Sequence, residues 1–193
     1  MDLEQAVSRF CGSDFSPLEI SALLKNLLTS YFSSPDNIIH DALKTRIYSD
    51  NSSQIIIEAA AAYKPEEAGF RPAIIITSGN WEARPLGIGS GFTLGSNPPR
   101  YGFNIVGQHI VNCIAKLPAE TELLAAEVFL FLMSMRPIIL RQFPIATFDS
   151  IHKTTLEPFN EGRTHYIERI MINYVVNYQY TIDITESTTT SSP

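Results

Sequence analysis

The sequence predicts an α+β fold, with a mixed, largely antiparallel β-sheet flanked by two main helices at about residues 16–32 and 118–135. Two segments repeat apolar residues at the three-and-four spacing of a helix face. Short isoleucine-rich runs between them have the composition of buried strands, and residues 167–184 alternate apolar and polar side chains as a strand does. A long glycine-rich loop between strands and a long C-terminal strand complete the expected architecture.

The size of the chain suits one domain. Its 193 residues are 45% hydrophobic and 18% charged, which is a globular composition that can fill one substantial core. We expect a single α+β domain over residues 1–185. Residues 186–193 are expected to form a disordered tail, because the C-terminal sequence TESTTTSSP is low in complexity.

The first helix is predicted from SPLEISALLKNLLTSYF, residues 16–32. Ser16 and Glu19 have the spacing of a capping box, and Pro17 suits the first helical position. The apolar residues that follow share one stripe: Ile20, Leu23, Leu24, Leu27, Leu28 and Tyr31. A weaker helical segment is expected at residues 37–48.

Three strands are predicted in the middle of the chain. QIIIEAAAAY (54–63) and RPAIIITSG (71–79) read as two paired strands, separated by a charged turn. Their successive apolar residues imply that both faces of the sheet are covered. The next strand is predicted at residues 101–116, with Gly107 as a bulge or crossing point.

Residues 118–135 form the second predicted helix. Pro118 opens it, and acidic residues follow in the first turn, where the helix dipole favours them. Beyond Leu123 the segment is apolar nearly all round, so this helix should be deeply buried. Arg136-Pro137 is expected to end it.

No membrane or export segment is expected. The longest apolar run, residues 128–135, is much shorter than the roughly 20 residues that cross a bilayer. The start of the chain is acidic and lacks the apolar stretch of a signal peptide.

The last strand is the most informative element. After a strand and a turn at residues 143–159, residues 167–184 alternate cleanly between apolar and polar side chains. About 17 residues at roughly 3.3 Å each reach about 55 Å, whereas a domain of this size is about 40 Å across. The strand must therefore bend at a bulge or run past the edge of its domain, where it would form a natural subunit contact.

Charge and cysteine content narrow the possible functions. The net charge of −6 is spread along the chain, and a general nucleic-acid binder would instead show a basic patch. DNA could still slide past such a surface without being held. The two cysteines, Cys11 and Cys113, suggest neither a disulfide framework nor a zinc site. We expect both to be buried free thiols in a reducing cytoplasm.

Residues 87–100, GIGSGFTLGSNPPR, contain four glycines within nine positions. A Walker loop would need a lysine, and none occurs between Lys64 and Lys116. A dinucleotide-binding loop would need a third glycine where Phe92 stands and a helix after it, whereas a strand is predicted there. We therefore expect a flexible connection between strands that orders against a partner.

No catalytic, cofactor-binding or metal-binding residue is predicted, and the protein is not expected to be an enzyme. The histidines lack the short spacings of metal ligands, and His109 is expected to be a core residue. Ser90 lies between glycines without the Gly-x-Ser-x-Gly spacing of a nucleophile elbow. No pair of carboxylates stands out.

Three tyrosines on the last predicted strand are better explained by packing than by nucleic-acid binding. Tyr174, Tyr178 and Tyr180 could stack on single-stranded bases. However, isoleucine and valine lie on the same face, and the opposite face carries a single arginine. We expect core or interface packing. The interface candidates are these three tyrosines together with Gly87, Gly89, Gly91, Phe92 and Arg100 of the loop.

The order helix, strand pair, long loop, strand, helix, strand and long strand resembles that of the tail-terminator (tail-completion, neck) proteins of tailed bacteriophages. The resemblance covers about residues 18–184. It is carried by RPAIIITSG (71–79), by GQHIVNCIAK leading into PAETELLAAEVFLFLM (107–133), and by NYVVNYQYTIDI (173–184).

The resemblance implies a structural virion protein. Such proteins form a ring, usually a hexamer, that caps the tail tube and docks onto connector or head-completion proteins. The implied partners are other copies of the chain, the tail tube or sheath protein, and a connector or head-completion protein. Genomic DNA would pass through the channel without specific binding, and neither a cofactor nor a membrane is implied. The implied location is the neck or tail of the virion, and the host cytoplasm during assembly.

Two other classes of function are compatible with the sequence. The first is another oligomeric virion adaptor, such as a connector or head–tail joining protein, or a host scaffold protein that uses the same strand-edge association. The second is a small cytoplasmic hydrolase or transferase whose site forms only from distant residues.

Overall fold

A computed structural model of the chain describes residues 17–49, 53–63, 71–85, 100–142, 145–159 and 165–181. It confirms the predicted α+β class, with a mixed sheet of six strands and two main helices. The predicted tail at 186–193 and the glycine-rich segment up to Pro99 lie outside the described residues.

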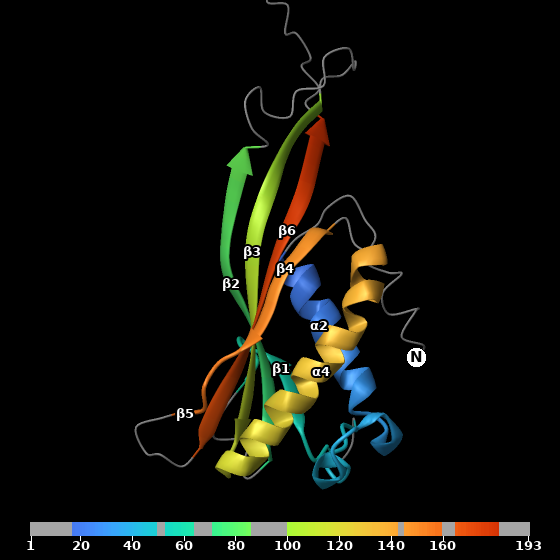
Figure 1. Cartoon of the computed structure of the whole chain (residues 1–193), viewed down its shortest axis with the longest axis vertical. Helices are drawn as coiled ribbons and strands as arrows, with labels where there is room; N and C mark the ends of the chain where they lie inside the picture. The colour runs from blue at the N-terminus through green and yellow to red at the C-terminus, as the bar shows by residue number, and fades with distance from the viewer. Residues whose placement is uncertain are drawn as a thin grey trace, which may run out of the picture.

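The sheet is mostly antiparallel. Its strand order is β1-β2-β3-β6-β4, with the short β5 also paired to β6. Only the β1–β2 pair is parallel among the pairs that are described. The strands are β1 (Ile56–Ala59), β2 (Ala73–Pro85), β3 (Arg100–Ala115), β4 (Ile145–Lys153), β5 (Glu157–Pro158) and β6 (Tyr166–Thr181), and Figure 1 shows their arrangement.

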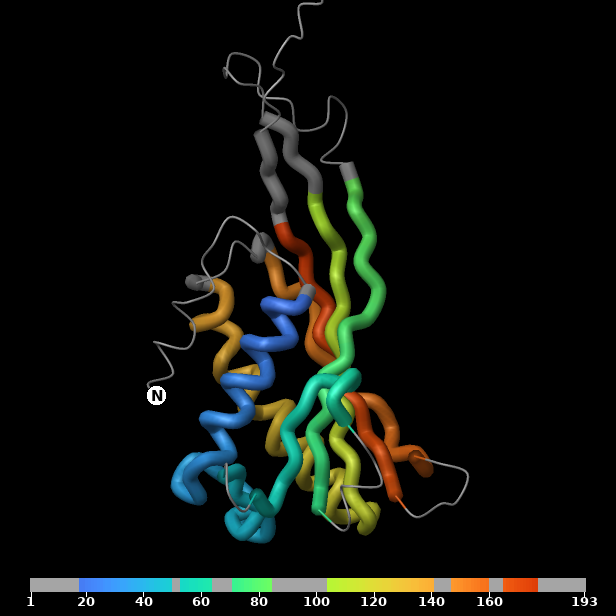
Figure 2. The backbone as a smooth tube through the Cα atoms, turned by 180° about the vertical axis from the view of Figure 1, so that it is seen from behind, coloured from blue at the N-terminus to red at the C-terminus, as the bar shows by residue number. Residues whose placement is uncertain are grey.

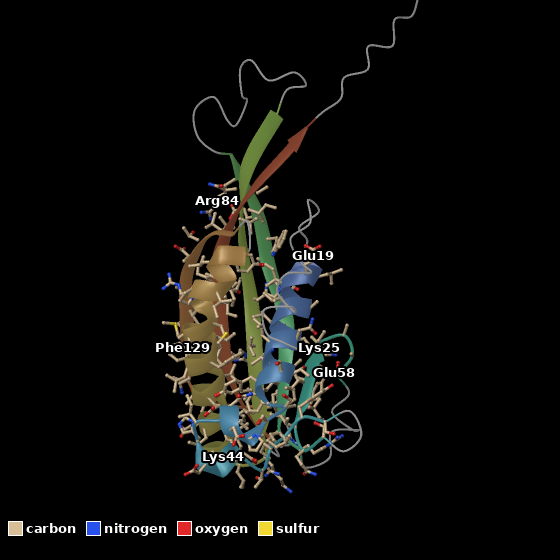
Figure 3. The ribbon with its side chains drawn as sticks, turned by 90° about the vertical axis from the view of Figure 1, so that its right-hand side faces the viewer. Glu19, Lys25, Lys44, Glu58, Arg84 and Phe129 are labelled. Carbon is tan, nitrogen blue, oxygen red and sulfur yellow. The ribbon has the colours of Figure 1, made fainter. Side chains whose placement is uncertain are left out.

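Both main helices, α2 (Pro17–Tyr31) and α4 (Pro118–Gln142), lie on the same side of the sheet (Figure 1). The six residues of the predicted stripe on α2 are all buried in the main core. An ion pair between Lys25 and Glu58, 2.8 Å apart, joins α2 to β1 (Figure 3). The predicted helical segment at residues 37–48 contains one short 3-10 turn, Asp41–Leu43, and follows another at Pro35–Asn37.

Strand β2 is buried on both faces, as its successive apolar residues predicted. Ile74 and Ile76 belong to the main core under the helices. Ala73 and Ile75 belong to a smaller cluster with Ile114 and Ile167. The alternation along a strand sends these two pairs of side chains to opposite faces.

The predicted end of the second helix is wrong, because α4 continues through Pro137 to Gln142. Tertiary contacts hold the turns around the proline. The Arg136 guanidinium donates to the Phe148 carbonyl oxygen at 3.0 Å, and Ile139 is buried in the core. Because the helix is longer than predicted, its segment Pro118–Leu140 has the length and the apolar composition of a helix that could cross a membrane. Its inner side, however, packs in the main core through Leu124, Ala125, Val128, Phe131 and Leu132.

The predicted irregularity at Gly107 is also misplaced. Strand β3 pairs with β6 without interruption from Arg100 to Ala115. The bulge lies on β2 instead, between Ser78 and Trp81, where β2 passes His109 and Gly107. Packing explains the glycine at position 107, because a Cβ atom there would lie 2.5 Å from Cε2 of Tyr174. The residue is small because an aromatic ring from the neighbouring strand covers it.

The last strand is long and carries the predicted buried face. In β6, which has 16 residues, Ile170, Ile172, Tyr174 and Val176 are buried. Strands β2, β3 and β6 run on together beyond the ends of both helices (Figures 1 and 2). We call this projecting part the tip: residues 82–85, 100–106 and 175–181, beyond the row formed by Trp81, Gly107 and Tyr174. The described part of β6 thus runs past the helical layer, and it does so without a register shift against β3 (Figure 1).

Candidate functional site

The interface candidates that the structure describes fall at two levels of the sheet. Arg100 opens β3 and pairs with Thr181, while Tyr178 and Tyr180 of β6 pair with Phe103 and Tyr101. The backbone therefore brings Arg100, Tyr178 and Tyr180 together in the tip. The loop candidates Gly87, Gly89, Gly91 and Phe92 lie outside the described residues.

Tyr174, in contrast, is a core residue of this chain. Its side chain is only 1% exposed, and it lies at the base of the tip against Gly107. The structure therefore assigns it to packing within the fold rather than to an outer surface. Alternation alone could not decide this, because Tyr174 belongs to the same alternating set of positions as Tyr178 and Tyr180.

A chain of polar groups runs across the base of the tip. The Trp81 indole N–H donates to the Tyr174 hydroxyl at 2.8 Å, and this hydroxyl lies 2.8 Å from Nδ1 of His109. On the other side of the imidazole, Nε2 lies 2.9 Å from Oγ of Ser21 and 3.4 Å from Oγ of Ser78. These five side chains connect strands β2, β3 and β6 with helix α2.

The direction of the hydrogen bond between Trp81 and Tyr174 follows from the indole group, which can only donate. Because the Tyr174 oxygen accepts from Trp81, its own hydrogen is available to His109 Nδ1. When Tyr174 donates this hydrogen to Nδ1, a neutral imidazole carries its proton on Nε2 and donates toward Ser21. Burial raises the pKa of the Tyr174 hydroxyl above its ordinary value, against the opposing effect of the Trp81 hydrogen bond. The tyrosine therefore keeps its proton.

This direction bears on the chemistry of the Ser21–His109 contact. A serine beside a histidine that is held by a third group is the arrangement of an activated nucleophile. Activation requires the imidazole to accept the serine proton, and the tautomer in which Tyr174 donates to Nδ1 has its own proton on Nε2, so it cannot accept that of Ser21. The contact is better explained as a fully satisfied polar link between α2 and the sheet. Among the residues that the structure describes, no group of three or more His, Cys, Asp or Glu side chains could hold a metal ion.

His109 is completely buried, which confirms it as a core histidine. Its partners were not predicted. Ser21 precedes it by 88 residues and Tyr174 follows it by 65, so no short spacing in the sequence links them.

A second buried polar cluster surrounds Glu127 on α4. Its carboxylate has no exposed surface and accepts from the Tyr31 hydroxyl, from the backbone N–H groups of Ile39 at 2.7 Å and His40 at 3.1 Å, and from the His40 ring. Burial alone would raise the pKa of Glu127, but these hydrogen bonds outweigh it and hold that pKa below its ordinary value. Glu127 therefore ties α2 and the turn at residues 38–40 to α4.

One sequence signal could have found this cluster. Glu127 is the only charged residue between Leu123 and Met135. An ionised side chain in so apolar a helix needs partners, because burying an unpaired charge is very unfavourable.

A second buried carboxylate, Glu168, lies opposite Cys113 on the neighbouring strand. Lys153 donates to its Oε1, while its Oε2 has no hydrogen-bond partner within the described part of the chain. Burial and the Glu168 charge raise the pKa of the Cys113 thiol. Cys113 is thus the buried, free cysteine that was expected.

The tip has two edges without a strand partner among the described residues. β1 pairs with β2 only as far as Ile76, and β4 pairs with β6 only as far as Val176. Beyond these rows β2 and β6 flank β3, and none of the described strands pairs with their outer sides. Figure 3 shows Arg84 at this level of the sheet, well away from the labelled residues of α2.

Helix α4 also shows apolar side chains on its outer side. Leu130, Met133 and Ile138 are exposed by 44%, 40% and 37%. Phe129, labelled in Figure 3, lies along the same helix and packs partly against the core.

A scan against protein-family models found no match for this chain, and a search of curated proteins found none either.

Proposed function

We propose that this protein is a structural component of the neck or tail of a tailed bacteriophage, of the tail-terminator kind. Copies of the chain form a ring that caps the tail tube and joins it to connector or head-completion proteins. The protein acts in the virion, after assembly in the host cytoplasm, and it does so without catalysis.

The observation that carries this proposal is the projecting tip. The base of the tip still belongs to the main core through Ile105 and Val176. Beyond these residues the described parts of β2, β3 and β6 continue as a narrow ribbon, and the edge strands of a sheet are templates for pairing with another chain. The sheet continues past both helices (Figure 1). A protein that acted alone would have little use for such a projection, whereas an assembly component needs a contact surface of this kind.

The charge of the chain supports the same proposal. A channel that conducts DNA must not hold it by phosphate contacts, which lysine and arginine make. With 14 Lys and Arg against 20 Asp and Glu, the chain suits such a passage.

The proposal is tested by determining the size of the purified protein and its binding partners. Light scattering after gel filtration and electron microscopy are applied to the protein alone and mixed with candidate tail-tube and connector proteins. We expect a closed ring, alone or on the end of a tail tube. Binding to a connector but not to a tail tube would identify another head–tail adaptor instead. A chain that stays monomeric under all these conditions would overturn the proposal.

A further inference from the structure

The residues that precede α2 carry the pattern of a short amphipathic helix. They lie outside the described part of the chain, and their sequence is MDLEQAVSRFCGSDFS. The apolar residues recur at the three-and-four spacing of one helix face. They are Leu3, Ala6, Val7, Phe10 and Cys11, and every other position from Asp2 to Arg9 is polar.

The same stretch has signals for both ends of a helix. Asp2 suits the N-cap, and Gln5 follows three residues later, which is the spacing of a capping box. Gly12 comes directly after the last apolar residue, where glycine commonly ends a helix. The sequence therefore predicts a helix at residues 3–11, about 13 Å long.

The outer side of α4 is an apolar surface of matching length. Leu130, Met133 and Ile138 are exposed there, and an apolar helix face is stable when another element covers it. Leu130 and Ile138 are eight residues apart, which is about 12 Å along a helix. Ser134, which is also exposed, lies midway between them on the same line of side chains.

The start of α2 places the predicted helix within reach of this surface. α2 begins at the level of the last turns of α4, and the two helices run in opposite directions (Figures 1 and 2). Only residues 12–16 connect the predicted helix to Pro17, and connections this short join antiparallel neighbours. The predicted helix would therefore turn back from the start of α2 and run beside α4.

A second copy of the chain fits the surface less well than this segment does. A stable interface buries roughly 800 Å² on each partner, and three side chains that are each more than half covered supply only a small part of that area. Leu18 is the only large apolar side chain that α2 exposes among its described residues, so α2 does not extend the surface. A single helix tethered to Pro17 avoids the entropic cost of bringing two molecules together.

We infer that residues 3–11 form a helix that packs on the outer side of α4 in the same chain, with their apolar stripe against Leu130, Met133 and Ile138. We call residues 3–11 the arm. A helix of this length is marginal on its own in water, so the arm is helical only where it is docked. Docking also buries the Cys11 thiol, and it does not depend on whether the chain forms a ring.

Cross-linking tests where the arm lies. Cys113 is completely buried, so a short bismaleimide can join Cys11 to a cysteine placed on the surface. Ser134→Cys puts one on the outer side of α4. We expect a link within one chain, seen by mass spectrometry as a monomer that carries one reagent and has lost both thiols.

The matched control places the cysteine on the other side of the sheet. Ser150 accepts from the Asn173 side chain, and Asn173 alternates with Ile172 and Tyr174, which face the main core under the helices. We expect Ser134→Cys to link to Cys11 at least about tenfold faster than Ser150→Cys does, because docking raises the effective concentration of the two thiols. Equal rates would overturn the inference. Covalent dimers from Ser134→Cys would also overturn it, since another copy would then cover α4.

Substitutions on the two sides of the arm test which side docks. Val7→Asp places a carboxylate on the apolar stripe, and we expect Cys11 to react with N-ethylmaleimide at least about tenfold faster than in the wild type, because the undocked arm exposes its thiol. Ser8→Asp adds the same charge to the polar side and should leave the rate unchanged. Leu130→Ser, which weakens the surface on α4, should raise the rate as Val7→Asp does. A Cys11 rate that neither Val7→Asp nor Leu130→Ser changes would overturn the inference.

Discussion

Glu127 shows how a single charged residue can organise an otherwise apolar helix. The carboxylate is buried, yet four donors from α2 and the turn at residues 38–40 surround it. Its pKa lies below the ordinary value of 4.5, because these hydrogen bonds outweigh the burial that would raise it. A group with a depressed pKa in the folded state stabilises the fold fully above its unfolded pKa. That contribution is lost as the pH falls through the folded pKa.

Replacing Glu127 with glutamine should therefore weaken the fold and its dependence on pH. Glu127→Gln places an amide among hydrogen-bond donors, so we expect a loss of about 1–3 kcal/mol in the free energy of unfolding at pH 7. Stability should also fall less steeply between about pH 5 and pH 3 than in the wild type. Urea unfolding at a series of pH values measures both. Glu122→Gln, at an exposed position on the same helix, is the matched control. Equal stability of both variants at pH 7 would show that the cluster contributes nothing.

Helix α4 is the element whose local sequence and final structure disagree most. An interior proline removes one backbone hydrogen bond and crowds the preceding turn, so Arg136-Pro137 is a reasonable place to end a helix. The structure continues for five residues beyond the proline, to Gln142. Burial of Ile139 and the hydrogen bond from Arg136 to β4 compensate for the proline. Helix length here is decided by packing against the sheet.

Removing this proline should stabilise the protein. Pro137→Ala restores the missing donor, and we expect a gain of up to about 3 kcal/mol in the free energy of unfolding. Pro118→Ala, at the first helical position, should change stability little, because the N–H there has no helical partner. Thermal and urea unfolding of the two variants give the comparison. A loss of stability in Pro137→Ala would mean that the bend at the proline is needed to seat Ile139.

The whole molecule divides into a body with a layered core and a tip in which β2, β3 and β6 continue past the helices. Ile105 and Val176, at the base of the tip, still belong to the main core. The main core lies between the sheet and the two helices, while β2, β3 and β6 project beyond them (Figure 2). The hydrogen-bonded chain Trp81–Tyr174–His109–Ser21 lies at the boundary between the body and the tip. Its four side chains come from β2, β6, β3 and α2, so it links the base of the tip to the helical layer.

The connection between β2 and β3 should therefore matter for docking more than for folding. Replacing residues 87–98 with a short Gly-Ser linker should change the free energy of unfolding by no more than about 0.5 kcal/mol. Binding to tail-tube or connector proteins should be lost. A Gly-Ser replacement of the original length separates the effect of sequence from that of length. Co-sedimentation with the purified partners measures docking, and a collapse of thermal stability would instead place the segment in the core.

Much of the fold could be predicted because the relevant signals are local. The stripe on α2 was confirmed residue by residue, and so was the buried face of β6 from Ile170 to Val176, since a helix or strand that faces a core must repeat apolar residues at its own period. The bulge was misplaced because glycine at position 107 reflects the ring of Tyr174 above it. Sequence alone does not show which strand's side chain covers a glycine.

The candidate site could be predicted only in part. Tyr178, Tyr180 and Arg100 were expected to lie at a contact surface, and the backbone brings them together in the tip. Tyr174, from the same alternating run, lies in the core instead. The polar partners Ser21, Trp81 and Glu127 were not foreseen, although an isolated glutamate in an apolar helix is a signal that could have indicated the last of them.

The sequence by itself determined which segments are helix or strand and which face of each is buried, because both are recorded in the spacing of apolar residues. The tertiary structure decided where α4 ends, which strand carries the bulge, and which polar groups meet. Those outcomes depend on contacts between residues far apart in the chain, such as Tyr31 and Glu127, which are separated by 96 residues. A hydrogen bond across that separation leaves no periodic trace in the sequence, and only the packed sheet and helices bring its two ends together.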